Sequence, residues 1–245
     1  MLFQMCYGPE VKSVYNVIRR NPGLTIDDLC QRFQYHPAGS IVSLLQGVIV
    51  LLSDLDMIRV SDGYRVTVDE PWNPVKISYK IFDLRHHVAD SALDYAFTHI
   101  YEDLFVLPDQ LFVPNLHVAV NMKYEQLAIG EEKINAWKRM MEYFGLGYRL
   151  YSGFYAIPHL RLLTDIIGQV DHWDGPLHRF CEDVINPNLP CLTASRAVFS
   201  GTIFALTHLH RQGSIHLARQ QDLPYPSYGE DKWNWVTITN TGVTQ

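Results

Sequence analysis

Eleven histidines and four cysteines are the side chains of this 245-residue sequence that are best suited to hold a metal ion, and their spacing is informative. The cysteines lie far apart, at Cys6, Cys30, Cys181 and Cys191. Zinc sites use pairs of ligands a few residues apart, and no Cys-x-x-Cys or His-Glu-x-x-His occurs. His86 and His87 are adjacent and diverge on a helix, as do His208 and His210. We therefore predict no metal site, no cofactor and no disulfide framework.

Sequence motifs that position a phosphate or a nucleophile do not occur either. The chain has no Gly-x-x-x-x-Gly-Lys-Ser/Thr, no Gly-x-Gly-x-x-Gly and no Gly-x-Ser-x-Gly. A nuclease needs carboxylates gathered around a metal ion, whereas Glu10, Asp27 and Asp28 fall in a segment with a different structural explanation. The sequence therefore predicts a protein that is not an enzyme.

Positive charge is scarce, which limits contact with nucleic acid. The chain has 20 basic and 26 acidic side chains and a net charge of −6, so any DNA contact must be local or indirect. The densest basic group contains Lys133, Lys138 and Arg139, and it is interspersed with the acidic residues Glu131, Glu132 and Glu142. The alternative interpretation is that these residues form a solvent-exposed helix face. The predicted DNA-binding residues are Lys133, Lys138, Arg139, Arg149 and, near the start of a later helix, Arg196.

The elements that carry these side chains begin with a predicted winged helix-turn-helix domain at residues 1–70. Apolar spacing predicts a helix over Val11–Arg20, and Thr25 is suited to cap a second helix. Ser40 is suited to cap a third, long apolar helix. Asp62-Gly63 lies between β-branched runs and predicts a hairpin with a type I′ turn.

The third of these helices, SIVSLLQGVIVLLSDLDMI at residues 40–58, contains no lysine or arginine. It is therefore poorly equipped to hold phosphate or to read base edges. An apolar helix of this kind is normally covered, either by its own chain or by another protein. We predict a partner-binding surface at Leu45, Ile49 and Leu52, and burial within the chain is the alternative.

A helical middle segment is predicted at residues 71–170, behind the proline-bearing linker at residues 69–75. Apolar residues recur from Ile77 to Leu104 and predict one helix or a broken pair. A further helix is expected in EEKINAWKRMMEYFGLG, a hairpin around Ser152-Gly153 and a short helix in HLRLLTDII. A degenerate third winged helix is the alternative for this segment.

The last segment, residues 171–245, predicts a C-terminal winged helix with an extended wing. PLHRFCEDVI is a short predicted helix, and Thr193–His210 is a longer apolar one. SIHLARQ and WNWVTIT are the expected strands, joined by the long flap QDLPYPSYGEDK. We predict that the aromatic residues Tyr225, Tyr228, Trp233 and Trp235 bind a partner. An equal alternative is that Trp233 and Trp235 line the inner face of the wing.

No membrane segment is expected, because the longest apolar stretch, Ile41–Leu52, is too short and includes Ser43, Gln46 and Gly47. The start of the chain also lacks the basic and apolar pattern of a signal peptide. The expected location is the cytoplasm.

Two stretches carry a resemblance to known proteins. SVYNVIRRNPGLTIDDLCQRF with IVSLLQGVIVLLSDLDMIRVSDGYRVT resembles winged-helix domains. EEKINAWKRMMEYFGLGYRLYSGFYAIPHLRLLTDII resembles small accessory subunits, neither nuclease nor ATPase, of Lamassu-type bacterial defence systems. In those systems an SMC-like ATPase complex senses foreign DNA ends and releases a nuclease. The tandem layout is also similar to the kleisin-interacting subunits of SMC complexes.

The resemblance implies a function but no site residues. It implies a non-catalytic accessory subunit that contacts an SMC-like ATPase and a nuclease effector, in defence against phage or plasmids. A winged-helix transcriptional regulator that binds DNA is the alternative. The expected fold is mostly α with short β-hairpin wings, as tandem winged helix-turn-helix domains around a helical middle segment.

Overall fold

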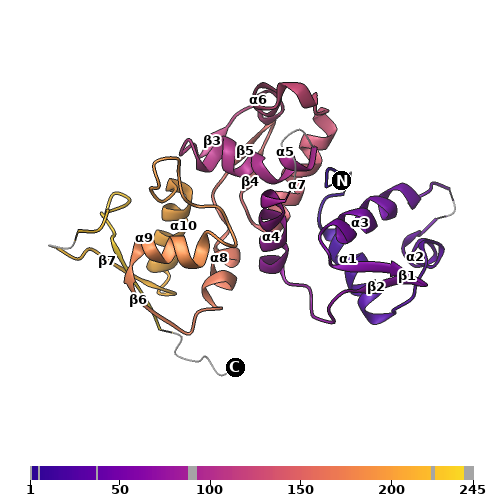
Figure 1. The fold of residues 1–245 in the computed structure, drawn as a ribbon, viewed down its shortest axis with the longest axis horizontal. Coiled ribbons are helices and arrows are strands. Elements are labelled where there is room, and N and C mark those ends of the chain that lie inside the picture. Colours follow the sequence, from indigo (N-terminus) through magenta and orange to yellow (C-terminus); the bar gives the residue numbers. More distant parts are fainter. Residues whose placement is uncertain (1, 5, 37, 88–92, 222–223, 240–245) are drawn as a thin grey trace.

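The structure is a computed structural model that describes residues 2–4, 6–36, 38–87, 93–221 and 224–239. About half of the chain is helical, and the strands of the described residues form small antiparallel sheets. Figure 1 shows three groups of elements: an N-terminal group on the right, a middle group at the top and a C-terminal group on the left. The predicted mostly helical fold with short strands is confirmed.

The N-terminal group contains three helices and one hairpin. Its elements are α1 (Pro9–Arg20), α2 (Ile26–Phe33), α3 (Val42–Asp54), β1 (Ile58–Ser61) and β2 (Gly63–Val66). The predicted cap at Thr25 is present, because the Thr25 hydroxyl accepts the Asp28 N–H at 3.3 Å and the Asp28 carboxylate accepts the Thr25 N–H at 2.8 Å. An isolated bridge joins Leu24 to Tyr64 on β2.

The hairpin between β1 and β2 is confirmed, but its turn differs from the prediction. A type I′ turn needs positive φ at both central residues, whereas only Gly63 has it here, at 111°. A Cβ atom at position 63 would lie 2.2 Å from the Gly23 carbonyl oxygen. The glycine therefore serves the close approach of β2 to the segment before α2.

The middle group combines helices with a three-stranded sheet. Its main elements are α4 (Pro74–Asp83), α5 (Leu93–Tyr101), β3 (Phe112–Val113), α6 (Leu116–Lys123), α7 (Glu131–Phe144), β4 (Tyr148–Leu150) and β5 (Gly153–Tyr155). The shorter turns are η1 (Leu84–His86), η2 (Glu102–Val106) and η3 (Glu125–Leu127). The predicted helix from Ile77 to Leu104 is interrupted, with residues 88–92 outside the described part. The sheet order is β3-β5-β4, and the hairpin predicted at Ser152-Gly153 is confirmed.

The C-terminal group also combines helices with a three-stranded sheet. Its elements are α8 (Leu160–Ile167), β6 (His172–Pro176), α9 (Leu177–Phe180), η4 (Cys181–Ile185), α10 (Ser200–Arg211), β7 (His216–Ala218) and β8 (Trp235–Thr239). The helix predicted from Thr193 begins only at Ser200. Arg196 therefore lies in a loop, with a φ of 65°, and not at a helix start as predicted.

One order of elements recurs in the three groups. A strand or bridge residue is followed by two helical segments and a hairpin, and the first strand pairs with the last. The sets are Leu24–α2–α3–β1–β2, β3–α6–α7–β4–β5 and β6–α9–α10–β7–β8. The helices α3, α7 and α10 therefore hold equivalent positions, directly before each hairpin.

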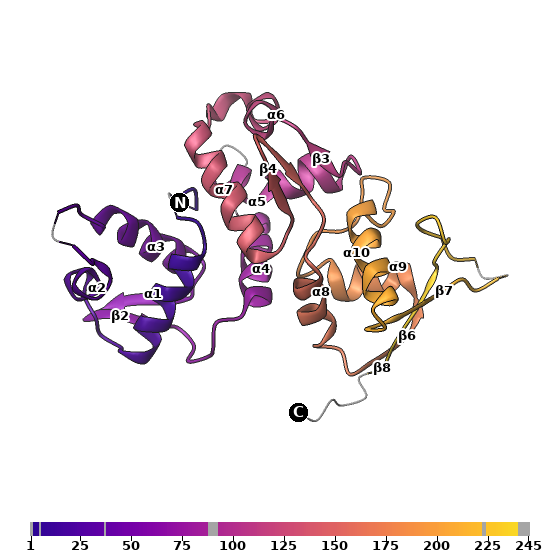
Figure 2. The same cartoon turned by 180° about the vertical axis from the view of Figure 1, so that it is seen from behind.

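The linker at residues 69–75 is anchored to the units on either side. The Trp72 ring packs between Tyr15, at 5.5 Å between ring centroids, and Phe144 of α7, at 6.5 Å. Arg19 on α1 also forms an ion pair with Asp69 at 2.7 Å. Figure 2 shows α4, which follows this linker, between the N-terminal and C-terminal groups.

Helix α3 is sealed, which corrects the prediction of a partner surface there. Leu45, Ile49 and Leu52 are only 1%, 7% and 0% exposed. The start of the chain contributes to this burial, since the Gln4 side chain packs over Gly47 and the Phe3 ring meets Phe97 of α5 at 5.1 Å. The apolar residues of α3 are therefore mostly covered by their own chain, with Val50 as the exposed exception.

Candidate partner-binding groove

The three equivalent helices expose different side chains. Helix α3 exposes the stripe Ser43, Gln46, Val50 and Asp54. Helix α7 exposes Glu131, Glu132 and Arg139. Helix α10 exposes Ser200, Phe204, His208 and Arg211. Phe204 is 54% exposed, and it is the largest apolar side chain presented by any of the three helices in the described chain. Helix α10 is therefore the strongest candidate for a partner contact.

Helix α10 is held in place by the middle group. The Asp109 carboxylate accepts hydrogen bonds from the N–H and the hydroxyl of Ser200, both at 2.8 Å, and so caps the helix. A Cβ atom at Gly201 would lie 2.3 Å from the Ala156 carbonyl oxygen, so glycine allows the helix to approach the backbone there. These contacts fix the exposed stripe of α10 relative to the rest of the molecule.

A short hairpin forms the wall opposite α10. Tyr228 and Trp233 exchange two backbone hydrogen bonds of 2.8 Å, and the Lys232 N–H donates to the Gly229 carbonyl at 3.2 Å. Gly229 and Lys232 both have positive φ, at 70° and 55°, which closes the loop tightly. A Cβ atom at Gly229 would lie 3.2 Å from the Ile203 side chain on α10. We call residues 228–233 the flap hairpin.

A groove of about 390 Å³ lies between α10 and the flap hairpin. Its apolar lining includes Leu111, Val198, Ile203 and Phe204. Arg211 and His208 line the helix side, and Glu230 and Asp231 line the flap side. Among the described residues no ion pair joins these opposite charges, so both rims remain open to an incoming chain.

The base of the flap hairpin is fixed by Tyr228. Its hydroxyl and His178 Nδ1 are hydrogen bonded at 2.8 Å. Burial, reinforced by nearby Cys181, raises the pKa of Tyr228 to about 12. The Trp233 ring packs against His210 of α10 at 5.1 Å between centroids. Contacts within the chain itself therefore hold the flap hairpin in place.

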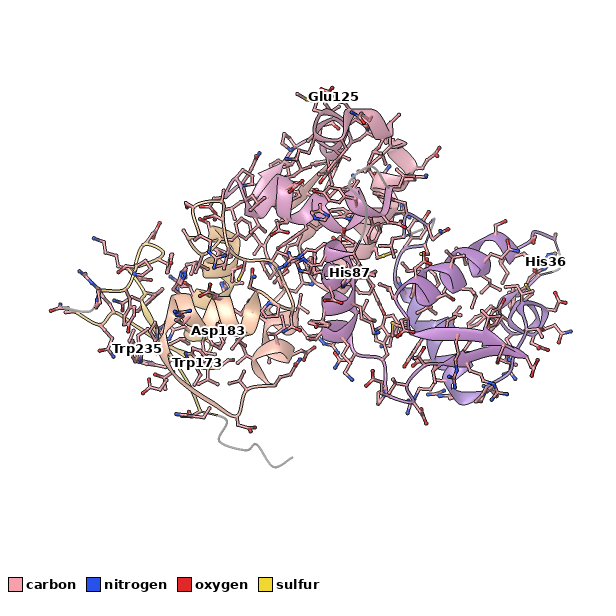
Figure 3. The ribbon with its side chains drawn as sticks, in the orientation of Figure 1. His36, His87, Glu125, Trp173, Asp183 and Trp235 are labelled. Carbon is pink, nitrogen blue, oxygen red and sulfur yellow. The ribbon has the colours of Figure 1, made fainter. Side chains whose placement is uncertain are left out.

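The four aromatic residues predicted to bind a partner have different environments. Tyr228 lines the groove, and Trp233 packs beneath it. Trp235 donates its indole N–H to Asp174 at 2.7 Å, and this bond, with a second from Thr237, holds the pKa of Asp174 low. Tyr225 lies 6.2 Å from the Trp235 ring. Figure 3 shows Trp235 with Trp173 on the strand side of the C-terminal group.

The predicted basic patch assembles in part but is already occupied. Lys138, Arg139 and Arg149 line one polar cleft of about 380 Å³ beside α7. The Arg139 guanidinium lies 4.4 Å from the centroid of the Tyr7 ring. Arg149 pairs with Glu142 through its guanidinium at 2.5 Å, and its N–H donates to the same carboxylate at 3.0 Å. Little of this charge is free for phosphate.

Lys138 is a structural residue. Its ammonium donates to the carbonyls of Tyr151 and Ser152, at 3.3 and 3.1 Å, in the turn between β4 and β5. Burial lowers the pKa of Lys138. The other two predicted cations lie elsewhere: Arg196 pairs with Glu182, and Lys133 is half-buried in the first turn of α7. The five residues predicted to contact DNA therefore do not gather at one surface, and their contact with DNA stays a prediction.

Sequence reasoning missed Phe204, His208 and Arg211. The signal was present, because positions 200, 204 and 208 fall on one helical face of the predicted segment, and position 211 follows directly after its end. The prediction for this segment rested on Arg196 and on its overall apolar character, so the outward position of Phe204 was overlooked. The acidic rim at Glu230 and Asp231 was part of the predicted flap without an assigned role.

Comparisons with protein-family models, with curated proteins and with solved structures find no match to this chain. Among the described residues no three histidine, cysteine or acidic side chains gather where they would hold a metal ion. In the same part of the chain every helix is too short or too polar to cross a bilayer.

Proposed function

We propose that this protein is a non-catalytic accessory subunit that binds a protein partner through the groove between α10 and the flap hairpin. The exposed Phe204 ring beside a preformed wall carries this proposal. Aromatic side chains at the centre of an interface supply large contact area at small entropic cost. A fixed wall lowers the ordering cost of binding further.

The recurring order of elements supports an assignment of three winged-helix units. Each set places one helix directly before a hairpin whose last strand pairs with the first strand. In DNA-binding proteins with a helix-turn-helix the second helix of the motif enters the major groove. In α3 that helix is apolar and mostly buried. In α7 the cations Lys138 and Arg149 are already bonded to other groups of the chain. In α10 the acidic residues of the flap hairpin lie opposite the helix. These features disfavour DNA reading in all three cases, and α10 alone presents an exposed aromatic ring for protein contact.

The resemblance to accessory subunits of Lamassu-type systems names the partners in this proposal. They are an SMC-like ATPase and a nuclease effector, in a cytoplasmic complex that acts against phage or plasmid DNA. The subunit bridges or restrains these partners, and DNA contact falls mainly to them.

Co-expression with the neighbouring genes tests this role. We expect a tagged chain to retain a partner and Phe204→Ala to weaken that retention by about ten-fold or more. Val50→Ala is the matched control, because Val50 is an exposed apolar residue on the equivalent helix α3. A wild-type chain that elutes alone, or equal losses in the two variants, contradicts the proposal.

The alternative is a transcriptional regulator that binds DNA through its winged helices. It predicts tight binding of the isolated protein to duplex DNA, with a steep loss of affinity as salt rises. This alternative is disfavoured because Lys138, Arg149 and Arg196 already bind carbonyl or carboxylate groups of the chain. Binding measured at increasing salt separates the two functions, since the accessory role predicts no tight binding by the isolated chain.

A further inference from the structure

Two arginines face each other on the hairpin of the N-terminal group. Arg59 on β1 is directly opposite Arg65 on β2, and both side chains are exposed on the same face. Like charges in directly opposed positions destabilise a hairpin. In the described part of the chain neither guanidinium has an ion pair, and that of Arg65 lies across the Gly23 backbone. Among the described residues, no carboxylate therefore lies within ion-pair distance of these two arginines.

Strand β1 is also the open edge of this small sheet. The other side of β2 is covered, since the Tyr64 N–H donates to the Leu24 carbonyl and the Gly23 N–H donates to the Tyr64 carbonyl, both at 2.8 Å. No strand of the described chain pairs with the outer side of β1. Val60 in this strand is 64% exposed.

The pairing pattern shows which backbone groups face outward. The Thr67 N–H donates to the Met57 carbonyl at 2.9 Å, so hydrogen-bonded pairs occur at Met57 with Thr67 and, two residues on, at Arg59 with Arg65. The N–H and C=O of Val60 therefore point away from β2. Strand β4 offers a contrast, because the Glu142 carboxylate occupies the outward N–H of Arg149 at 3.0 Å.

We propose that the open edge of β1 binds an extended, acidic segment of a protein partner as an added strand. Backbone hydrogen bonds to Val60 would hold the segment, and its carboxylates would neutralise Arg59 and Arg65. A second copy of the chain is a poor occupant, because it would bring further arginines to the pair. A nucleic-acid duplex is disfavoured too, since residues 1–70 contain six basic and eight acidic side chains.

This inference rests on the proposed role as an interaction subunit, but it concerns a different surface from the α10 groove. The two fail separately, because substitutions at Phe204 leave the β1 edge intact. Loss of peptide binding at β1 with normal partner retention through α10 would overturn only the inference made here.

The test uses the full chain and a fluorescein-labelled peptide, Gly-Thr-Glu-Val-Glu-Val-Glu-Val-Thr-Gly, in fluorescence anisotropy. We expect binding that weakens by about ten-fold or more in the Arg59→Glu/Arg65→Glu variant, which removes the complementary charge. Arg32→Glu is the charge control, because Arg32 is exposed on α2 of the same group. Equal weakening by this control, or no binding by the wild-type chain, overturns the proposal.

The strand geometry needs a separate variant. Val60→Pro removes only the outward N–H, which an edge strand tolerates, whereas Val60→Ala keeps it. We expect loss of binding in Val60→Pro alone, with an unchanged circular dichroism spectrum, and protection of the Val60 amide from hydrogen exchange in the wild-type complex. Equal binding by both variants, by the peptide with lysine in place of glutamate, or by a labelled DNA duplex overturns the added-strand proposal.

Discussion

Helices α3 and α10 occupy equivalent positions in their units, yet they end in opposite environments. The long apolar run of α3 is mostly buried by its own unit and by Gln4 near the start of the chain, and Leu52 is fully buried. Helix α10 is less apolar as a whole, but it keeps the Phe204 ring exposed beside the flap hairpin. The exposed face of a helix, and not its overall composition, therefore decides whether it is available to a partner.

The largest effect on stability is expected for a substitution in the buried face of α3. Leu52→Ala removes a fully buried side chain and should lower the free energy of unfolding by about 2–5 kcal/mol, measured by urea denaturation. Val50→Ala on the same helix should change it by less than about 0.5 kcal/mol, because that side chain is partly exposed. Similar small losses in both variants would mean that α3 is not sealed.

The second largest effect on stability is expected at the hydrogen bonds that cap the starts of α10 and α3. Asp109→Ala should cost about 0.5–2 kcal/mol, because it removes both hydrogen bonds to Ser200 at the start of α10. Asp109→Asn should cost less, since asparagine also caps helices and tolerates the positive φ of 53° at this position. Ser40→Ala near the start of α3 is the comparison, since Ser40 makes only a 3.3 Å contact with the Val42 N–H. A larger loss at Ser40 than at Asp109 would reverse this assignment.

Alkaline pH tests the wall of the groove. Because the pKa of Tyr228 is raised from its ordinary value of 10.0 to about 12, its stabilising contribution is complete below pH 10. Above pH 10 the unfolded chain loses the phenol proton first, so this contribution falls as pH rises toward 12. Tyr228→Phe should be less stable at neutral pH by about 1 kcal/mol, with a shallower loss of stability between these pH values. Parallel pH profiles for the two proteins would exclude this role.

The smallest effect on stability is expected at the proposed partner site. Phe204→Ala should change the free energy of unfolding by less than about 0.5 kcal/mol, because the ring is more than half exposed. The same variant is expected to weaken partner retention. A large loss of stability would show that Phe204 supports the fold, and its effect on binding would then lose its meaning.

Much of the fold followed from local signals. The cap at Thr25, the hairpins at Gly63 and Gly153, and strands β7 and β8 of the C-terminal group were predicted from residue types whose backbone preferences act over a few positions, whereas β6 was missed. The start of α10 was missed because the Asp109 cap comes from a residue 91 positions away. The type I′ turn was wrong because Ser61 pairs with Gly63, which leaves only Asp62 between the strands, whereas that turn needs two central residues.

The sequence by itself determined that the chain is mostly helical, acidic overall and without the familiar motifs of phosphate or metal chemistry, since composition and spacing are local properties. The tertiary structure alone decided which surfaces are free. It buried Leu45 and Leu52, joined Lys138 to the turn between β4 and β5 and Arg149 to Glu142, and left Phe204 exposed. The physical reason is that burial and charge neutralisation depend on neighbours brought together by folding, and no spacing along the chain encodes those neighbours directly.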